Sequence, residues 1–124
     1  MIKFDEQKQL DSVAGALAIR KEIEGIAADV AGRGYKNICY LGIGGTYASA
    51  LQTQNHVQEY SGMEIIAQNA ALYNTTGNRR IGKDTVIVLS SVTGTTQEVV
   101  AAVEKAKAQG AVVIGFVDTA DTPL

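Results

Sequence analysis

The sequence predicts an α/β protein with three layers, in which helices flank a parallel sheet of flavodoxin-like strand order. Four short apolar runs alternate with segments of helical period along the 124 residues. Such alternation is typical of parallel strands joined by right-handed crossovers. The 13 glycines are clustered rather than scattered, and the only proline is Pro123, which indicates regular elements joined by tight turns.

The first predicted element is a long amphipathic helix over residues 8–32, where apolar residues recur at steps of three and four. Gly32 and Gly34 are expected to end it. A short apolar run at 37–41 predicts a buried strand, and residues 46–60 return to helical spacing. The first half of the chain therefore reads helix, strand, helix.

A second short strand is predicted at 63–67, followed by a mixed stretch at 69–82 that is expected to hold one helical turn and a loop. The residues Gly82–Asp84 are typical of a turn. The run 85–90 gives the clearest strand of the chain.

The clearest helix is predicted over 95–109. Thr95 and Glu98 have the spacing of a capping box, and Gly110 stands where a helix commonly ends. Residues 112–117 form the fourth strand. The sequence thus predicts one domain over residues 1–124, with a four-stranded sheet of order 2-1-3-4.

Composition excludes several functions. The formal charge of −2 argues against a strongly basic nucleic-acid binder and against a polybasic membrane-surface protein. A single cysteine excludes an internal disulfide and a cysteine-based zinc cage. No apolar run approaches the roughly 20 residues of a membrane span. We expect a cytoplasmic protein without a metal or a cofactor.

Two strand-to-helix turns carry the functional signal. Residues 42–47 follow the first strand and residues 90–96 follow the third, and both are rich in glycine and hydroxyl groups. Glycines let backbone N–H groups approach a ligand, and a helix N-terminus adds unpaired donors and positive partial charge. Because the first and third strands are neighbours in the predicted order, both turns should face one anion. The alternative is that these residues only cap their helices.

Commoner phosphate-binding motifs fit the sequence poorly. A G-x-G-x-x-G fingerprint would need glycine at Tyr47, and the acidic residue expected near the end of the second strand is absent. The P-loop motif does not occur, and neither turn contains a lysine. A cradle of hydroxyls and amides suits a phosphomonoester on a small metabolite.

The two turns resemble the sugar isomerase (SIS) domain family. The segment Leu41–Ala48 resembles the family's first glycine turn, and Ser91–Glu98 resembles its S-x-S-G-x-T-x-E phosphate loop, with Thr93 replacing the second serine. The resemblance covers nearly the whole chain. It is closest to the branch of fructosamine-6-phosphate deglycases and the isomerase half of glucosamine-6-phosphate synthase.

The resemblance implies a phosphosugar site without a cofactor. The positions that it assigns to the phosphate are Gly45, Thr46, Ser91, Val92, Thr93, Gly94 and Thr96. Sugar contacts are expected at Gly44, Tyr47 and Glu98. It also implies a fifth strand, a homodimer or higher homo-oligomer, and a catalytic glutamate and histidine that lie beyond residue 124. We therefore expect an N-terminal portion of a longer protein.

The reaction stays open. A sugar-phosphate isomerase or a deglycase would move a proton between C1 and C2. However, Leu72 stands where related deglycase-like sequences often carry an acidic residue. The alternatives are a non-catalytic phosphosugar sensor and a nucleotide binder with a Rossmann-like fold.

The remaining reactive residues have simpler explanations. His56 is expected to be solvated, and Cys39 to be a small residue of the core. Arg79, Arg80 and Lys83 are expected on a solvated edge, with a role in holding the sugar phosphate as the alternative.

Overall fold

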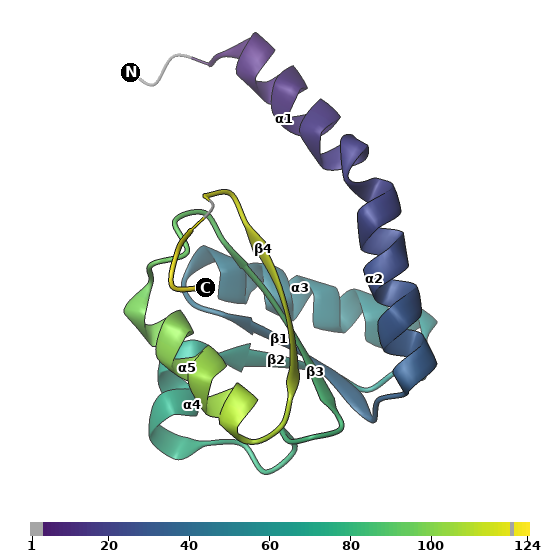
Figure 1. Cartoon of the computed structure of the whole chain (residues 1–124), viewed down its shortest axis with the longest axis vertical. Helices are drawn as coiled ribbons and strands as arrows, with labels where there is room; N and C mark the ends of the chain where they lie inside the picture. Colours follow the sequence, from purple (N-terminus) through teal and green to yellow (C-terminus); the bar gives the residue numbers. More distant parts are fainter. Residues whose placement is uncertain (1–3, 120) are drawn as a thin grey trace. The chain divides into compact units, whose positions relative to one another are not determined.

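A computed structural model of the chain describes residues 4–119 and 121–124, and divides into two compact units after Gly34. The first unit contains two consecutive helices, α1 (Glu6–Ala18) and α2 (Arg20–Arg33) (Figure 1). The Asp5 carboxylate caps α1 by accepting a hydrogen bond from the Lys8 amide. None of the residues in these two helices is buried.

The prediction of one helix over 8–32 was wrong, because the helical path breaks at Ile19, with φ −88° and ψ 4°. The apolar pattern offers a reason. Leu17 and Ile23 are six residues apart, which is about 120° short of two full turns, so the apolar stripe changes face between them. A single straight helix would not keep these side chains on one side. Gly34, with φ 77°, ends α2 as expected.

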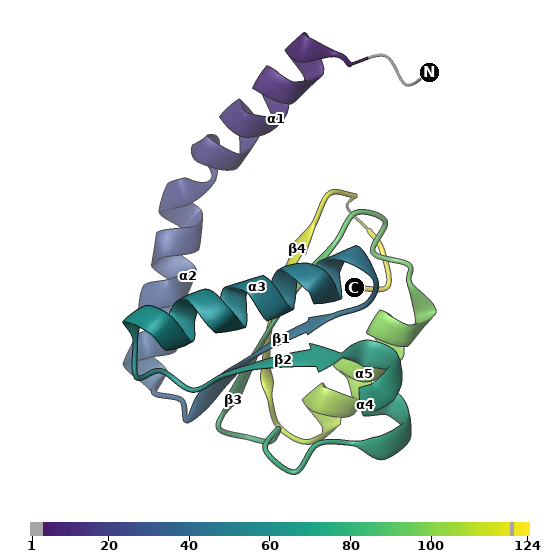
Figure 2. The same cartoon turned by 180° about the vertical axis from the view of Figure 1, so that it is seen from behind.

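The second unit is a four-stranded sheet between layers of helices. All pairs of neighbouring strands are parallel, and the order β2-β1-β3-β4 confirms the predicted order 2-1-3-4. Figures 1 and 2 show α3 on one face and α4 and α5 on the other, which confirms the three-layer prediction. The elements are β1 (Asn37–Gly42), α3 (Gly45–Tyr60), β2 (Ile65–Asn69), α4 (Ala70–Thr76), β3 (Thr85–Ser91), α5 (Gln97–Ala108) and β4 (Val112–Val117).

The second strand lies two residues later than the predicted range 63–67. Ile65 pairs with Ile38, and the strand continues through Gln68 and Asn69, which pair with the end of β1. Gln68 is buried because its amide is satisfied: Oε1 accepts a hydrogen bond from Asn78 at 2.8 Å, and Nε2 donates to the Asn69 carbonyl. The prediction ended this strand too early because Gln68 and Asn69 are polar, although both pair with β1.

The start of α5 also differs from its prediction. The helix begins at Gln97 with Thr96 as its N-cap residue, so Thr95 lies outside it and forms no capping box with Glu98. The physical reason is that the Thr95 hydroxyl is used inside the preceding loop. The C-terminal end agrees with the prediction, because Gly110, with φ 88°, follows the helix in a Schellman arrangement.

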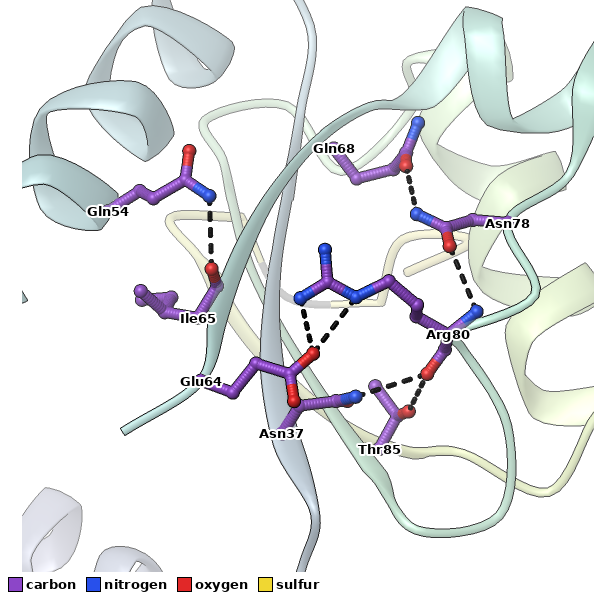
Figure 3. Close-up of polar contacts among 8 residues, drawn as sticks. All are labelled: Asn37, Gln54, Glu64, Ile65, Gln68, Asn78, Arg80 and Thr85. Atoms are coloured by element: carbon purple, nitrogen blue, oxygen red, sulfur yellow. Dashed lines mark hydrogen bonds and ion pairs between the residues drawn. The ribbon is translucent and has the colours of Figure 1, made fainter. Parts of the chain in front are cut away.

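Polar contacts fix the edge where the strands begin (Figure 3). Arg80 pairs with Glu64 through its guanidinium, and Nε lies 2.9 Å from the Glu64 carboxylate. The Arg80 carbonyl accepts hydrogen bonds from Asn37 and Thr85, the first residues of β1 and β3. This edge of the sheet is therefore held by structural contacts. Ligands of parallel α/β sheets bind at the opposite end, beyond the carboxyl ends of the strands, so we look for the functional site there.

Candidate anion-binding site

The two predicted turns leave the sheet side by side. β1 and β3 are paired neighbours, with Leu41 opposite Leu89 near their carboxyl ends. The turn from β1 leads into α3, and the loop from β3 leads into α5. Strand pairing thus brings both segments to one edge of the sheet, as the order 2-1-3-4 requires.

The first turn is tightly wound against the start of α3. A Cβ atom at Gly42 would lie 2.6 Å from the Thr46 carbonyl carbon and from the Tyr47 amide nitrogen, so only glycine fits there. Gly44 has φ 57°, a conformation that favours glycine. The Thr46 hydroxyl accepts a hydrogen bond from the Ile43 amide at 3.0 Å and donates one to the Ile43 carbonyl at 2.9 Å.

The second loop folds around its own hydroxyl groups. Ser91 Oγ accepts a hydrogen bond from the Gly94 amide at 3.0 Å. Thr93 Oγ1 accepts from the Thr95 amide at 3.3 Å and from the Thr95 hydroxyl at 3.0 Å. Thr96 is half-buried at the N-cap position of α5, and its side chain makes no capping hydrogen bond.

These contacts divide the four predicted phosphate-binding hydroxyls into two kinds. A hydroxyl has one proton to donate and two lone pairs to accept with. Thr46 already donates its proton to a backbone carbonyl. Ser91 and Thr93 only accept within the loop, and Thr96 is unpaired among the residues that the structure describes, so all three keep a proton for a ligand. Thr46 thus shapes its turn, and the loop from β3 supplies the available hydroxyl donors.

Backbone amides add donors at the start of both helices. In α3 the first backbone hydrogen bond of the helix runs from the Ala48 amide to the Gly44 carbonyl. The amides of residues 45–47 come before it and therefore have no partner within the helix. In α5 the amides of Val99 and Val100 both bond to the Thr96 carbonyl, which leaves those of residues 97–98 ahead of them. Neither turn contains a lysine or an arginine. The arrangement can hold a compact anion through hydroxyls, amides and two helix N-termini.

The other predicted ligand contacts lie within the two turns or in the first turn of the helix that follows. Gly44 and Gly45 are exposed in the first turn, where Tyr47 is half-buried. Val92 is exposed at the tip of the second loop. Glu98 is exposed in the first turn of α5, and its backbone carbonyl accepts a hydrogen bond from Asn74. Roles for these residues toward a ligand stay predictions.

Three reactive residues lie away from the cradle. Cys39 is fully buried in β1, and burial raises the pKa of its thiol to about 12, which keeps it protonated. His56 is exposed in α3, where its ring lies tilted against that of Tyr60, with centroids 4.9 Å apart and an interplanar angle of 56°. Arg80 lies where the strands begin, at the end of the sheet opposite the cradle.

One contact of the second loop was missed by sequence reasoning. The chain beyond β4 returns to this loop, and Thr122 lies directly against Gly94. The two residues are 28 positions apart, and no local pattern links them. Only the tertiary structure reveals this neighbour of the candidate site.

Comparison with known proteins agrees with the fold. The family model described as the SIS domain matches residues 33–124. A Salmonella typhimurium LT2 protein with the suggested function of a phosphosugar isomerase is 28% identical, with a TM-score of 0.71, over 79% of this chain and 30% of that one. No curated protein sequence matches.

Two further solved structures share the fold at lower identity. Tagatose-6-phosphate ketose/aldose isomerase from Escherichia coli is 16% identical, with a TM-score of 0.73, over 86% of this chain and 30% of that one. The C-terminal domain of glucosamine-fructose-6-phosphate aminotransferase from Francisella tularensis is 19% identical, with a TM-score of 0.65, over 73% of this chain and 25% of that one. This chain therefore spans less than a third of each of these three structures.

Proposed function

The chain belongs to the SIS domain family, and from that premise we propose that it is the phosphosugar-binding domain of a sugar-phosphate isomerase or a fructosamine-6-phosphate deglycase. The single observation that carries the proposal is the set of free hydroxyl protons in the loop from β3. Ser91, Thr93 and Thr96 keep a proton to donate, beside the amides at the start of α3 and α5.

Such a cradle suits a phosphate dianion for a physical reason. Hydrogen bonds to a charged group contribute about 1.5–3 kcal/mol each, roughly twice as much as bonds between neutral groups. Fixed amides and hydroxyls need little reorganisation, and two helix N-termini add positive partial charge. A monoester presents its oxygens as a compact acceptor, which a cradle without lysine or arginine side chains can surround.

The phosphate grip would serve the reaction at a distance. An aldose–ketose isomerisation transfers a proton between C1 and C2 through an enediol, and a deglycase passes through the corresponding enaminol. Binding energy at the phosphate fixes the reacting carbons relative to the acid and base groups, which lowers the entropic part of the barrier. In this proposal the domain binds and orients the sugar. The proton-transfer residues are proposed to come from elsewhere in the complete enzyme.

Calorimetric titration of the chain with fructose 6-phosphate tests the binding function. Fructose, which has the same sugar body without the phosphate, is the matched ligand control. We expect saturable binding of the phosphate ester and none of the free sugar at the same concentrations. Equal affinity for both would contradict an anion cradle, and absence of binding by fructose 6-phosphate, glucosamine 6-phosphate and fructosamine 6-phosphate would overturn the assignment.

Turnover by the complete protein separates the finer possibilities. Interconversion of a ketose and an aldose 6-phosphate would identify an isomerase. Release of an amine from a fructosamine 6-phosphate would identify a deglycase. Tight binding without turnover of any of these would favour the third candidate, a phosphosugar sensor.

Self-association is a further part of the proposal. Large apolar side chains are exposed along α1 and α2, among them Leu10, Val13, Leu17 and Ile26. A second copy of the chain could cover such a surface, as the expectation of a homodimer requires. Light scattering coupled to size exclusion should give the mass of a dimer or of a higher oligomer. A monomer at all concentrations would contradict this part of the proposal.

A further inference from the structure

The segment that follows β4 returns to the loop from β3. Thr119 Oγ1 lies 3.4 Å from the Val92 carbonyl oxygen and donates to it. Thr122 lies against Gly94, and Leu124 packs partly buried against the hydrophobic core. Figure 1 shows this last part of the chain, in yellow, passing beside the loop that joins β3 to α5. We call residues 118–119 and 121–124 the strap.

Thr122 leaves no room for a side chain at Gly94. A Cβ atom at Gly94 would lie 2.1 Å from Thr122 Oγ1 and 2.6 Å from Thr122 Cβ, so any side chain there would displace the strap. Gly94 is buried and has φ 63°. Its amide is the group that bonds to Ser91 Oγ. Thr122 therefore packs against Gly94, and the Gly94 amide in turn holds the hydroxyl oxygen of Ser91, one of the free hydroxyl donors.

The backbone of the strap supports the same conclusion. Asp121 has φ 57°, and within residues 4–119 and 121–124 it alone has a positive φ without being glycine. That conformation is unfavourable for residues other than glycine, although aspartate tolerates it better than most. Strain of this kind persists where the surroundings hold the backbone in place. Here the neighbouring Thr122 lies against Gly94, and Leu124 packs against the hydrophobic core.

We propose that the strap holds the loop from β3 in its anion-binding conformation, with Thr122 as a positioning residue that acts through Gly94. The part of this inference that concerns the anion rests on the proposed function. Thr122 fixes Gly94, Gly94 fixes the Ser91 hydroxyl oxygen, and the Ser91 proton stays directed to the ligand. A loosened strap would leave the hydroxyl groups of Ser91, Thr93 and Thr96 present, but it would no longer hold the loop in the conformation that brings them together.

Two measurements on the whole chain test the strap. The first is hydrogen exchange of the Gly94 amide without ligand, which reports on its bond to Ser91. The second is the affinity for fructose 6-phosphate. Thr122→Ala removes the contacting side-chain atoms, whereas Thr122→Val keeps their shape. The matched control is Thr75→Ala, because Thr75 is exposed on α4 and its hydroxyl bonds only to carbonyls of its own helix.

Thr122→Ala should speed exchange at Gly94 and weaken fructose 6-phosphate binding, each by about fourfold, which is the effect of losing one methyl-sized contact. Thr122→Val should leave both values within about twofold of the wild-type chain, because valine keeps the β-branched shape of threonine and the proposal assigns the positioning to shape. Thr75→Ala should change neither. A valine variant as impaired as the alanine variant would overturn the proposal, and so would an alanine variant with wild-type exchange at Gly94.

A double-mutant cycle tests whether the effect passes through Gly94. Gly94→Ala should displace the strap and weaken binding strongly, and adding Thr122→Gly should recover part of the loss by making room for the new methyl group. Strictly additive effects would show that the two residues act separately and would overturn the proposed path.

The exchange measurement also separates this inference from the proposed function. If no sugar phosphate binds the wild-type chain but Gly94 exchange still responds to Thr122→Ala and recovers in Thr122→Val, the phosphosugar assignment fails and the ordering of the loop by the strap stands. If fructose 6-phosphate binds and Thr122→Ala changes neither measurement, the strap fails and the assignment stands.

Discussion

Replacing Thr96 by valine isolates one free hydroxyl donor at the proposed phosphate site. Valine keeps the β-branched shape and removes the proton. The Thr96 side chain makes no capping hydrogen bond. Loss of its hydroxyl should therefore change the free energy of unfolding by less than about 0.5 kcal/mol. A hydrogen bond to a dianion contributes about 1.5–3 kcal/mol, so fructose 6-phosphate should bind about 10- to 150-fold more weakly.

Thr46→Val is the matched comparison, because its hydroxyl is engaged differently. It accepts from the Ile43 amide and donates to the Ile43 carbonyl, so valine breaks two hydrogen bonds of the turn. At about 1 kcal/mol each, the chain should lose roughly 2 kcal/mol of stability. The two variants should therefore separate: Thr96→Val loses affinity at normal stability, whereas Thr46→Val loses stability first.

Calorimetry with fructose 6-phosphate and urea unfolding measure the two quantities on the same samples. Wild-type affinity in Thr96→Val would refute the assignment of a free donor to this residue. Unchanged stability in Thr46→Val would refute the argument that its proton is committed to the turn.

Three further predictions concern the scaffold. Gly42→Ala should destabilise the chain by about 3 kcal/mol or more in urea unfolding, because the new Cβ would meet backbone atoms. Gly45→Ala should be nearly neutral, because a Cβ there has open space. Equal effects of the two variants would contradict the close approach of the backbone to Gly42. The hydrogen bond from Arg80 lowers the pKa of Glu64 below its ordinary 4.5, so its stabilising effect is present above that pH and is lost as the pH falls through the lowered pKa. The difference in urea midpoint between wild type and Glu64→Gln should accordingly vanish in acid, and a constant difference would refute the ion pair. Cys39 should react with a thiol reagent at pH 8 far more slowly in the folded chain than in urea, and equal rates would contradict its burial.

Much of the fold was predictable because the sequence is locally consistent. The apolar run 37–41 forms a largely buried strand as expected, and the glycine after α5 has the left-handed conformation that ends a helix. Prediction failed where long-range contacts decide. Gln68 continues β2 because Asn78, ten residues away, satisfies its amide. The Thr95 hydroxyl does not cap α5, because Thr93 accepts its proton.

The candidate site shows the same division. The two turns and their common edge followed from the pattern of strands and glycines. The distinction between Thr46 and Thr96 did not, because both are threonines near a helix start and only the hydrogen bonds tell them apart. The contact of Thr122 with Gly94 depends on the return of the chain after β4, which no local signal announces.

We propose that the turn from β1 and the loop from β3 hold one anion together. The most direct measurement is an amide NMR titration of the chain with fructose 6-phosphate, following Thr46 in the turn and Gly94 in the loop. Both signals should shift along curves that fit one dissociation constant. Movement of only one of them, or two different constants, would contradict a shared site.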